Sequence, residues 1–231
     1  MLKKTLLAGA CFVALVSGAQ AADSVELKVT GNLVNGSCTP SLLNNGVVDF
    51  GHIPLGNLSK TQTNQLGKKT TTLTITCDSA MPVAWQAVDN HSASTQVLTV
   101  TKAFANGGDC TRSDSHFGLG KTAADVNIGS FCLAVDKDNV TVDGVKSDLV
   151  EQSYQEGVDT WHTIAGGDLT NGVNGQWRYM TAAEASTLKP MAGKVFVYPL
   201  MVSAAIQGTD TLAITDNTNL DGSATLSLIY L

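Results

Sequence analysis

The chain has 231 residues, of which 43% are hydrophobic and 15% charged, and its formal net charge is −6 at pH 7. The acidic balance argues against nucleic acid or an anionic membrane surface as a partner. Abundant glycine, with frequent Thr, Val, Ser and Asn, favours an all-β domain, and the length suits one large sandwich or one domain with an insertion.

Residues 1–21 have the pattern of a secretory signal peptide. Two lysines precede an apolar run, residues 6–16, that is too short to cross a membrane, and residues 19–21 form a small-x-small cleavage site. Cleavage before Ala22 leaves 231 − 21 = 210 residues and a net charge of 12 − 20 = −8. Because no later apolar run is long enough to span a bilayer, we expect an exported chain in the periplasm or at the cell surface.

Four cysteines remain after this cleavage: Cys38, Cys77, Cys110 and Cys132. An even number in an exported chain indicates disulfides, and four cysteines allow three pairings. We favour the sequential pairs, Cys38 with Cys77 and Cys110 with Cys132. The competing interpretation is a zinc site. The absence of a Cys-x-x-Cys motif, and of a histidine at ligand spacing from a cysteine, argues against it.

Period-two alternation begins at residue 24 and predicts a strand over residues 24–34, with Val25, Leu27 and Val29 on one face. The same pattern predicts strands over residues 47–51, 72–77, 83–87 and 97–100. In the strand over residues 83–87 we expect Trp85 to pack in the core.

Residues 30–38, Thr-Gly-Asn-Leu-Val-Asn-Gly-Ser-Cys, resemble the first strand of type 1-like pilins of the chaperone–usher class. Residues 47–51, Val-Val-Asp-Phe-Gly, are similar to the second strand of that family. The strand that ends at Cys77 resembles the third, whose cysteine pairs in the family with the one after the first strand. The chain is also similar to an uncharacterised family of exported fimbria-associated proteins, which have a pilin-like start and a longer body.

Residues 104–180 do not match an ordinary pilin. We expect them to form a long, loop-rich insertion that the second cysteine pair crosslinks. Glycine-rich turns separate expected strands around Cys132 and over residues 139–145. Aromatic residues in this segment, Trp161 and Trp177 above all, are the candidates for a ligand-binding loop. The alternative is that they pack the insertion onto the sandwich.

The remaining elements lead to a terminal strand. Residues 181–188 are alanine-rich and predict a helical turn, and residues 194–206 predict a long central strand with a bulge or kink at Pro199. A short strand is expected over residues 209–214. The last stretch, residues 220–231, alternates, with one face formed by Leu220, Gly222, Leu226, Leu228 and Tyr230.

Signatures of catalysis are missing from the sequence. It has no Gly-x-Ser-x-Gly motif, and its four histidines are scattered. We therefore expect a protein without enzyme activity, cofactor or metal.

The resemblance to pilins implies an immunoglobulin-like β-sandwich with an incomplete strand complement and an open hydrophobic groove beside the terminal strand. The implied partners are a periplasmic pilus chaperone, an outer-membrane usher and other fimbrial subunits. In this scheme Val25, Leu27 and Val29 would be the donor residues, and the alternating face of residues 220–230 would belong to the acceptor side. The chain would then be a structural, minor or tip component of a fimbria that contributes to cell adhesion.

Two departures from the pilin pattern bear on this expectation. The stretch before Thr30, Ala22 to Val29, is shorter than the usual donor extension, and Thr218 stands where the family commonly has a glycine. The alternative function is an exported ligand- or carbohydrate-binding sandwich that does not polymerise.

Overall fold

The computed structural model describes residues 26–32, 36–154, 160–214 and 217–231. The chain divides into two units, residues 1–34 and 35–231. In the first, residues 26–32 form neither helix nor strand, and Leu27 and Val29 are 86% and 88% exposed. The strand expected over residues 24–34 is therefore not present in the described part, because a strand needs a neighbour for its N–H and C=O groups. The signal peptide and Val25 lie outside the described residues.

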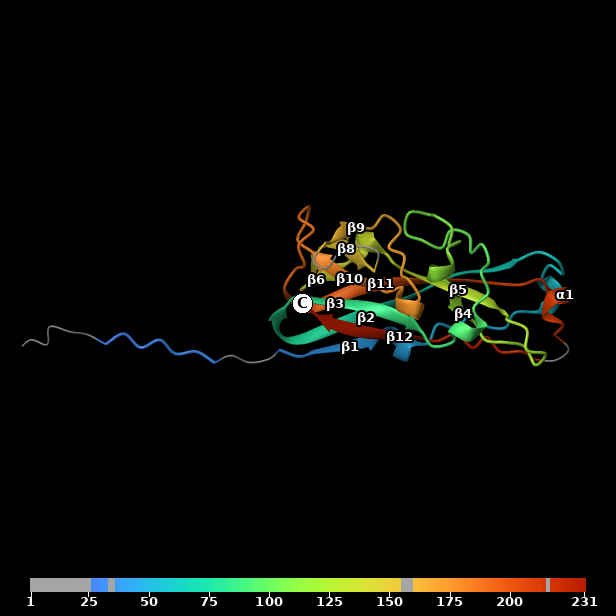
Figure 1. Ribbon diagram of the computed structural model, residues 1–231, viewed down its shortest axis with the longest axis horizontal. Helices are drawn as coiled ribbons and strands as arrows, with labels where there is room; N and C mark the ends of the chain where they lie inside the picture. Colours follow the sequence, from blue (N-terminus) through green and yellow to red (C-terminus); the bar gives the residue numbers. More distant parts are fainter. Residues whose placement is uncertain (1–25, 33–35, 155–159, 215–216) are drawn as a thin grey trace, which may run out of the picture. The chain divides into compact units, whose positions relative to one another are not determined.

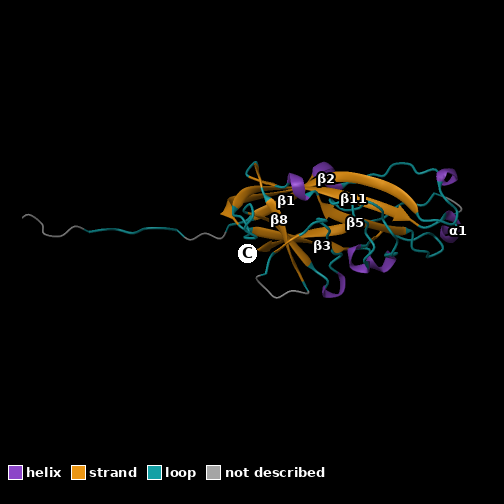
Figure 2. Ribbon diagram, turned by 90° about the horizontal axis from the view of Figure 1, so that it is seen from above, coloured by secondary structure: helices purple, strands orange, loops and turns teal. Residues whose placement is uncertain are grey.

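Residues 36–231 contain two antiparallel sheets, so the expected all-β sandwich is confirmed (Figures 1 and 2). The first has the strand order β1 (Cys38–Leu42), β2 (Asn64–Met81), β11 (Gly193–Ile206), β5 (Gly129–Val135), β4 (Phe117–Gly118), and β6 (Thr141–Val142) and β7 (Val145–Lys146) join it beside β11. The second has the order β12 (Ala224–Tyr230), β3 (Val83–Asp89), β10 (Arg178–Ala183), β8 (Asp148–Ser153), β9 (His162–Thr163).

Helical structure in the described residues is limited to single turns. One α-helical turn, α1 (Thr209–Leu212), lies at the opposite end of the sandwich from the end of β12 (Figure 1). The 3₁₀ turns are Leu43–Gly46, Leu55–Asn57, Ser92–Ser94, Ser113–Ser115, Lys137–Asn139 and Val173–Gly175. Within the described ranges, no helix is long and apolar enough to cross a membrane.

The core lies between the sheets, where alternate apolar side chains of facing strands meet. Trp85 of β3 is fully buried, as expected, and its ring meets that of Tyr198 of β11 edge-on at 5.5 Å. The Tyr198 hydroxyl accepts a hydrogen bond from the N–H of Ala182 at 3.0 Å, which ties the two sheets together. Burial raises the pKa of Tyr198 well above its usual value.

The long strand expected over residues 194–206 is β11, which pairs with β2 on one side and with β5 and β6 on the other. The bulge or kink expected at Pro199 was wrong, because the β11–β2 register passes through Pro199↔Thr72 without a shift. The carbonyl of Pro199 accepts the N–H of Asp136, just after β5 ends. The missing N–H of proline therefore faces the gap between β5 and β6, where no ladder bond is required.

Three expected elements were assigned wrongly. Residues 97–99 form no strand, and only Val100 makes a bridge, to Cys110. Residues 181–183 belong to β10, and a turn follows them, because burial of this segment between β3 and β8 outweighs the helix propensity of alanine. Residues 209–214 contain α1 in place of a strand.

The segment 104–180, expected as an insertion, contributes strands to both sheets. It contains β4 to β9 and the start of β10, and β5 and β8 lie inside the sheets, not at their edges. Both disulfides have the favoured pairing, Cys38–Cys77 and Cys110–Cys132.

Candidate functional site: a groove between two unpaired edges

A groove opens between the edge strand β1 of one sheet and the edge strand β12 of the other. Its cavity has a volume of about 250 Å³ and is lined mainly by apolar side chains of both sheets: Leu42, Val48, Phe50, Leu119, Phe131, Leu133, Leu200, Val202, Leu220, Ala224 and Leu226. Toward α1 it continues into a wider hollow of about 900 Å³, which shares Val48, Phe50 and Leu220 with it. The two hollows thus form one trough along the side of the sandwich.

Several apolar residues along this trough are incompletely buried, whereas others that line it, such as Leu119, Leu133 and Leu200, are buried. Leu42, Phe50, Leu226 and Leu228 pack against the core while they remain partly exposed, although core strands elsewhere bury equivalent residues fully. Each further Å² of apolar surface that an occupant covered would contribute about 25 cal/mol. The sandwich is therefore open on this side, and a chain laid in the trough would complete its core.

The edge of β12 presents backbone groups that β3 does not use. Ser223 accepts the N–H of Asn90 from the neighbouring strand, and the register continues as Thr225↔Val88 and Ser227↔Gln86. Because antiparallel partners alternate, the odd-numbered residues bond to β3, and the N–H and C=O groups of the even-numbered ones point toward the trough. The even-numbered residues are Ala224, Leu226, Leu228 and Tyr230. This is an unpaired strand edge of the kind that accepts an added strand.

The opposite rim is a segment that we call the strap, residues 47–50. We expected it to be part of a strand, which was wrong: it forms no ladder, although its burial alternates, with Val48 and Phe50 turned inward and Val47 and Asp49 exposed. In the described part of the chain, the backbone groups of residues 48–50 have no backbone hydrogen-bond partner. Its strand-like pattern therefore faces β12 across the groove without a neighbour.

A sharp turn separates the strap from β1. Asn44, Asn45 and Gly46 all adopt left-handed conformations, with φ of 53°, 53° and 79°. Asparagine and glycine tolerate this region better than other residues. The turn directs the chain away from the β1–β2 ladder and along the rim of the groove.

The end of the groove near the disulfide Cys38–Cys77 is closed. The N–H of Cys38 donates to the hydroxyl of Tyr230 at 3.0 Å, which links the start of β1 to the end of β12. Beside it the N–H of Ser37 donates to Asp78 at 2.9 Å, and this bond lowers the pKa of the Asp78 carboxyl. On β1 itself, Pro40 has no N–H to offer. An added strand would therefore pair with β12 and the strap more readily than with β1.

The structure places part of the predicted acceptor face, the alternate residues of 220–230, along the groove. Leu220, Gly222 and Leu226 line the groove, Leu228 packs against the core beside it, and Tyr230 closes its end. A Cβ atom at Gly222 would lie 2.9 Å from a ring carbon of Phe131, so a glycine is needed where the chain crosses the groove wall. Thr218, at the position where pilins commonly have a glycine, lines the wider hollow instead.

The aromatic residues proposed for a ligand loop lie away from the groove. Trp177 stacks on Tyr179 with ring centroids 4.2 Å apart, and both are partly buried. Trp161 is also partly buried. No ring contact joins Trp161 to the other two among the described residues.

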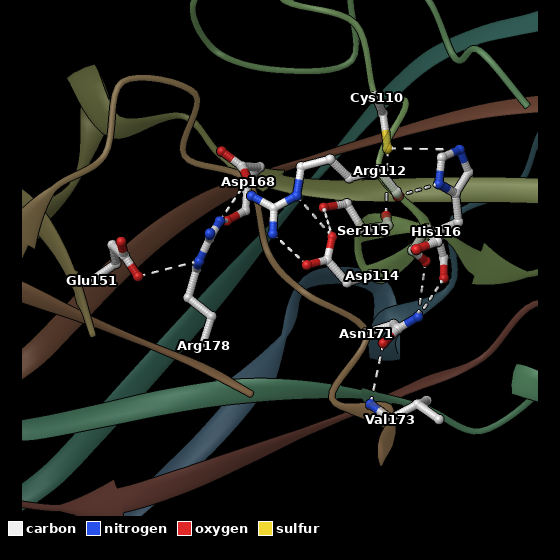
Figure 3. A network of polar contacts seen from close by, with 11 residues as sticks. Cys110, Arg112, Asp114, Ser115, His116, Glu151, Asp168, Asn171, Val173 and Arg178 are labelled. Carbon is white, nitrogen blue, oxygen red and sulfur yellow. Dashed lines mark hydrogen bonds and ion pairs between the residues drawn. The ribbon is translucent and has the colours of Figure 1, made fainter. Parts of the chain in front are cut away.

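Two polar clusters were missed by the sequence analysis because no sequence motif links their members. Arg178 of β10 forms ion pairs with Glu151 of β8 at 3.2 Å and with Asp168 at 2.5 Å, and all three are largely buried (Figure 3). His116, one of the histidines that seemed scattered, lies with its Nε2 atom 4.0 Å from the sulfur of Cys110. Sequence spacing carries no signal for either cluster.

Residues 27–132 match the sequence profile of a family described as "Protein of unknown function (DUF1120)". Over 241 residues the chain is 32% identical to "Uncharacterized protein YhcF" of Escherichia coli (strain K12), with 99% of this chain and 98% of the relative covered. The chain therefore belongs to the DUF1120 family, together with this relative. Over 252 residues it is also 29% identical to "Protein GltF" of the same strain, with 99% of each chain covered. The part that matches the DUF1120 profile contains all four disulfide cysteines.

Proposed function

We propose that this DUF1120 protein is a structural subunit, or a minor or tip component, of a chaperone–usher fimbria and is assembled by β-strand addition. In this role it is exported, has no catalytic activity, is held by a periplasmic pilus chaperone and an outer-membrane usher, and then contributes to cell adhesion at the surface.

The observation that carries the proposal is the groove with two unpaired edges. An apolar floor alone could bind many ligands. An extended peptide is favoured because β12 offers free N–H and C=O groups on one side, and the strap offers them on the other. Backbone hydrogen bonds would fix the added strand, while its alternate side chains would fill the cavity between them.

The N-terminal stretch of another copy is the occupant we propose for a direct test. Residues 25–33 alternate apolar and polar, and Leu27 and Val29 are almost fully exposed in the described residues. A strand with this pattern can place one apolar face on the groove floor and keep Glu26 and Lys28 in solvent. The periodicity and the exposure of this stretch thus match an open groove that needs an apolar strand face.

The experiment is a binding titration of the purified chain with a labelled peptide of residues 22–34, followed by fluorescence anisotropy and by the size of the protein in solution. The control peptide carries Leu27→Asp and Val29→Asp, which keep the length and remove the apolar face. Saturable binding of the first peptide, with loss in the control, supports the proposal. Equal binding of both peptides, or a monomer that binds neither this peptide nor strands from fimbrial subunits, refutes it.

A second candidate function is an exported ligand- or carbohydrate-binding sandwich that does not polymerise. It is favoured by the partly exposed Trp177–Tyr179 stack, since aromatic faces are suited to sugar rings. Binding on a glycan array that is lost in Trp177→Ala, together with no response to the peptide, would favour this candidate.

A further inference from the structure

The sandwich receives its N-terminal segment at a fixed point, beside the closed end of the groove. The N–H of Ser37 donates to the carboxylate of Asp78 at 2.9 Å, and the carbonyl of Ser37 accepts the N–H of Asp78. Gly36 lies against the end of β2, because a Cβ atom on it would be 2.7 Å from the sulfur of Met81. Ser37 therefore marks the point from which any N-terminal strand is tethered to this sandwich.

Exposed apolar side chains surround this point. Tyr230, which is 51% exposed, accepts the N–H of Cys38 with its hydroxyl, and Leu231 beside it is 48% exposed. Val195 of β11, which is 37% exposed, pairs with the same β2 residue as Thr39 of β1. We call this set the exit face, and it consists of Met81, Val195, Tyr230 and Leu231. Folding of a single chain leaves these side chains uncovered, as is typical of a surface that meets a partner.

The length of the tether decides which copy can receive the N-terminal strand. When residues 25–33 form the added strand, four residue steps separate residue 33 from Ser37, and they span at most about 14 Å. Because the groove is closed beside Tyr230, the tethered end of the strand has to leave it at the other end, beside Ala224. The six steps of β12 from Ala224 to Tyr230 cover about 20 Å. The tether is too short for that distance, so the strand in this scheme comes from a second copy.

We propose that the exit face is a docking surface for a second copy of this chain, and that it meets the α1 end of that copy head to tail. This inference rests on the proposed function, since it takes the N-terminal strand as the occupant of the groove. With the strand bound, the tether holds Ser37 of the donor within about 14 Å of the open end of the acceptor's groove. The apolar side chains around Ser37 then lie against the acceptor's rim, where Leu55 is 43% exposed at the edge of the wider hollow.

The contact joins two different surfaces, so each added copy offers a free groove or a free exit face to the next one. Such a heterologous contact extends into a filament unless its rotation closes a ring. Once the strand is bound, docking of the exit face is an intramolecular step that covers further apolar surface. The whole chain should therefore bind a second copy more tightly than the isolated peptide of residues 22–34 does, because the peptide has the strand and lacks the exit face.

The test compares two dissociation constants on the full mature chain, residues 22–231. Sedimentation velocity over a concentration series gives the Kd between copies, and fluorescence anisotropy gives the Kd of the peptide of residues 22–34. We expect the Kd between copies to be at least about tenfold lower. Leu231→Asp should raise it about tenfold and leave the peptide Kd unchanged, because the new charge would lie against an apolar rim. The matched control is Thr72→Asp, which adds the same charge midway along β2, and we expect it to change neither Kd.

A longer tether gives a second test. Insertion of a flexible Gly-Ser stretch of about eight residues between Asn35 and Gly36 extends the tether to about 40 Å, enough to reach the open end of the chain's own groove. We expect this chain to be monomeric and to bind the peptide weakly, since its own strand competes.

Three results overturn the inference and leave the proposed function intact, provided that the wild-type chain binds the peptide. They are a Kd between copies no lower than that of the peptide, a Leu231→Asp variant that associates no more weakly than Thr72→Asp, and an inserted chain that assembles like the wild type. A wild-type chain that binds no peptide refutes the proposed function, and this inference with it.

Discussion

Replacement of Leu226 by alanine tests whether the groove is an unfinished part of the core. Leu226 lies in β12, lines the groove and is only partly buried in the free chain. The substitution removes three carbon atoms, each worth about 0.8 kcal/mol when fully buried, or about 2.4 kcal/mol in total. If about half of this burial exists in the free chain, about 1.2 kcal/mol is lost from folding and about 1.2 kcal/mol from strand binding.

The assay measures both quantities on the same variant. Chemical denaturation of the free chain gives the loss of folding free energy, and titration with the peptide of residues 22–34 gives the loss of binding, which 1.2 kcal/mol predicts to be about eightfold in Kd. Thr225→Ala is the matched control, because Thr225 lies beside Leu226 on the exposed face of β12. We expect this control to leave the peptide affinity unchanged.

Two results would refute the reasoning. A loss of 2–5 kcal/mol in the free chain with unchanged peptide affinity would mean that Leu226 is an ordinary core residue and that the groove is closed in solution. Equal losses of affinity in Leu226→Ala and Thr225→Ala would mean that the peptide does not bind with its apolar face in the groove.

Three further predictions concern the rest of the sandwich. Arg178→Met should cost about 3–5 kcal/mol in chemical denaturation, because it leaves the buried carboxylates of Glu151 and Asp168 without their cation, and a loss below 1 kcal/mol would contradict this. The folded-state pKa of Tyr198 is raised, so stability should fall as the pH rises through the unfolded value of about 10, and thermal unfolding should find a smaller fall in Tyr198→Phe. Trp177→Ala should leave the affinity for the peptide of residues 22–34 unchanged, since its stack lies outside the groove lining, and a tenfold weaker Kd would count against the groove as the binding site.

Strands that bury one face in the core could be predicted from the sequence, because such a strand alternates apolar and polar residues. Residues 72–77 and 83–87 lie within β2 and β3, and the face that holds Leu73 and Ile75 is buried. The wrong predictions of secondary structure occurred where tertiary packing overrides the intrinsic propensity of a segment. Alanines 182 and 183 favour a helix, yet they are buried in β10, where sheet pairing decides their conformation.

The strap, residues 47–50, shows how far the candidate site could be predicted from the sequence. The alternation of Val48 and Phe50 is real, since both side chains turn inward, but pairing depends on a neighbour that the sequence of the segment does not specify. Likewise, the alternation of β12 predicts a half-buried strand and does not reveal which of its edges is free. The environment of His116 could not be predicted at all, because Leu98 and Cys110 reach it from separate parts of a long loop.

Amide hydrogen exchange along β12 tests strand addition most directly. In the free chain we expect the amides of Leu226 and Leu228, which point into the groove, to exchange rapidly, while those of Thr225 and Ser227 are protected by β3. Addition of the peptide of residues 22–34 should slow the first pair and leave the second unchanged. If the peptide binds and the amides of Leu226 and Leu228 still exchange rapidly, it does not pair with β12, and the account of this groove as a strand acceptor is contradicted.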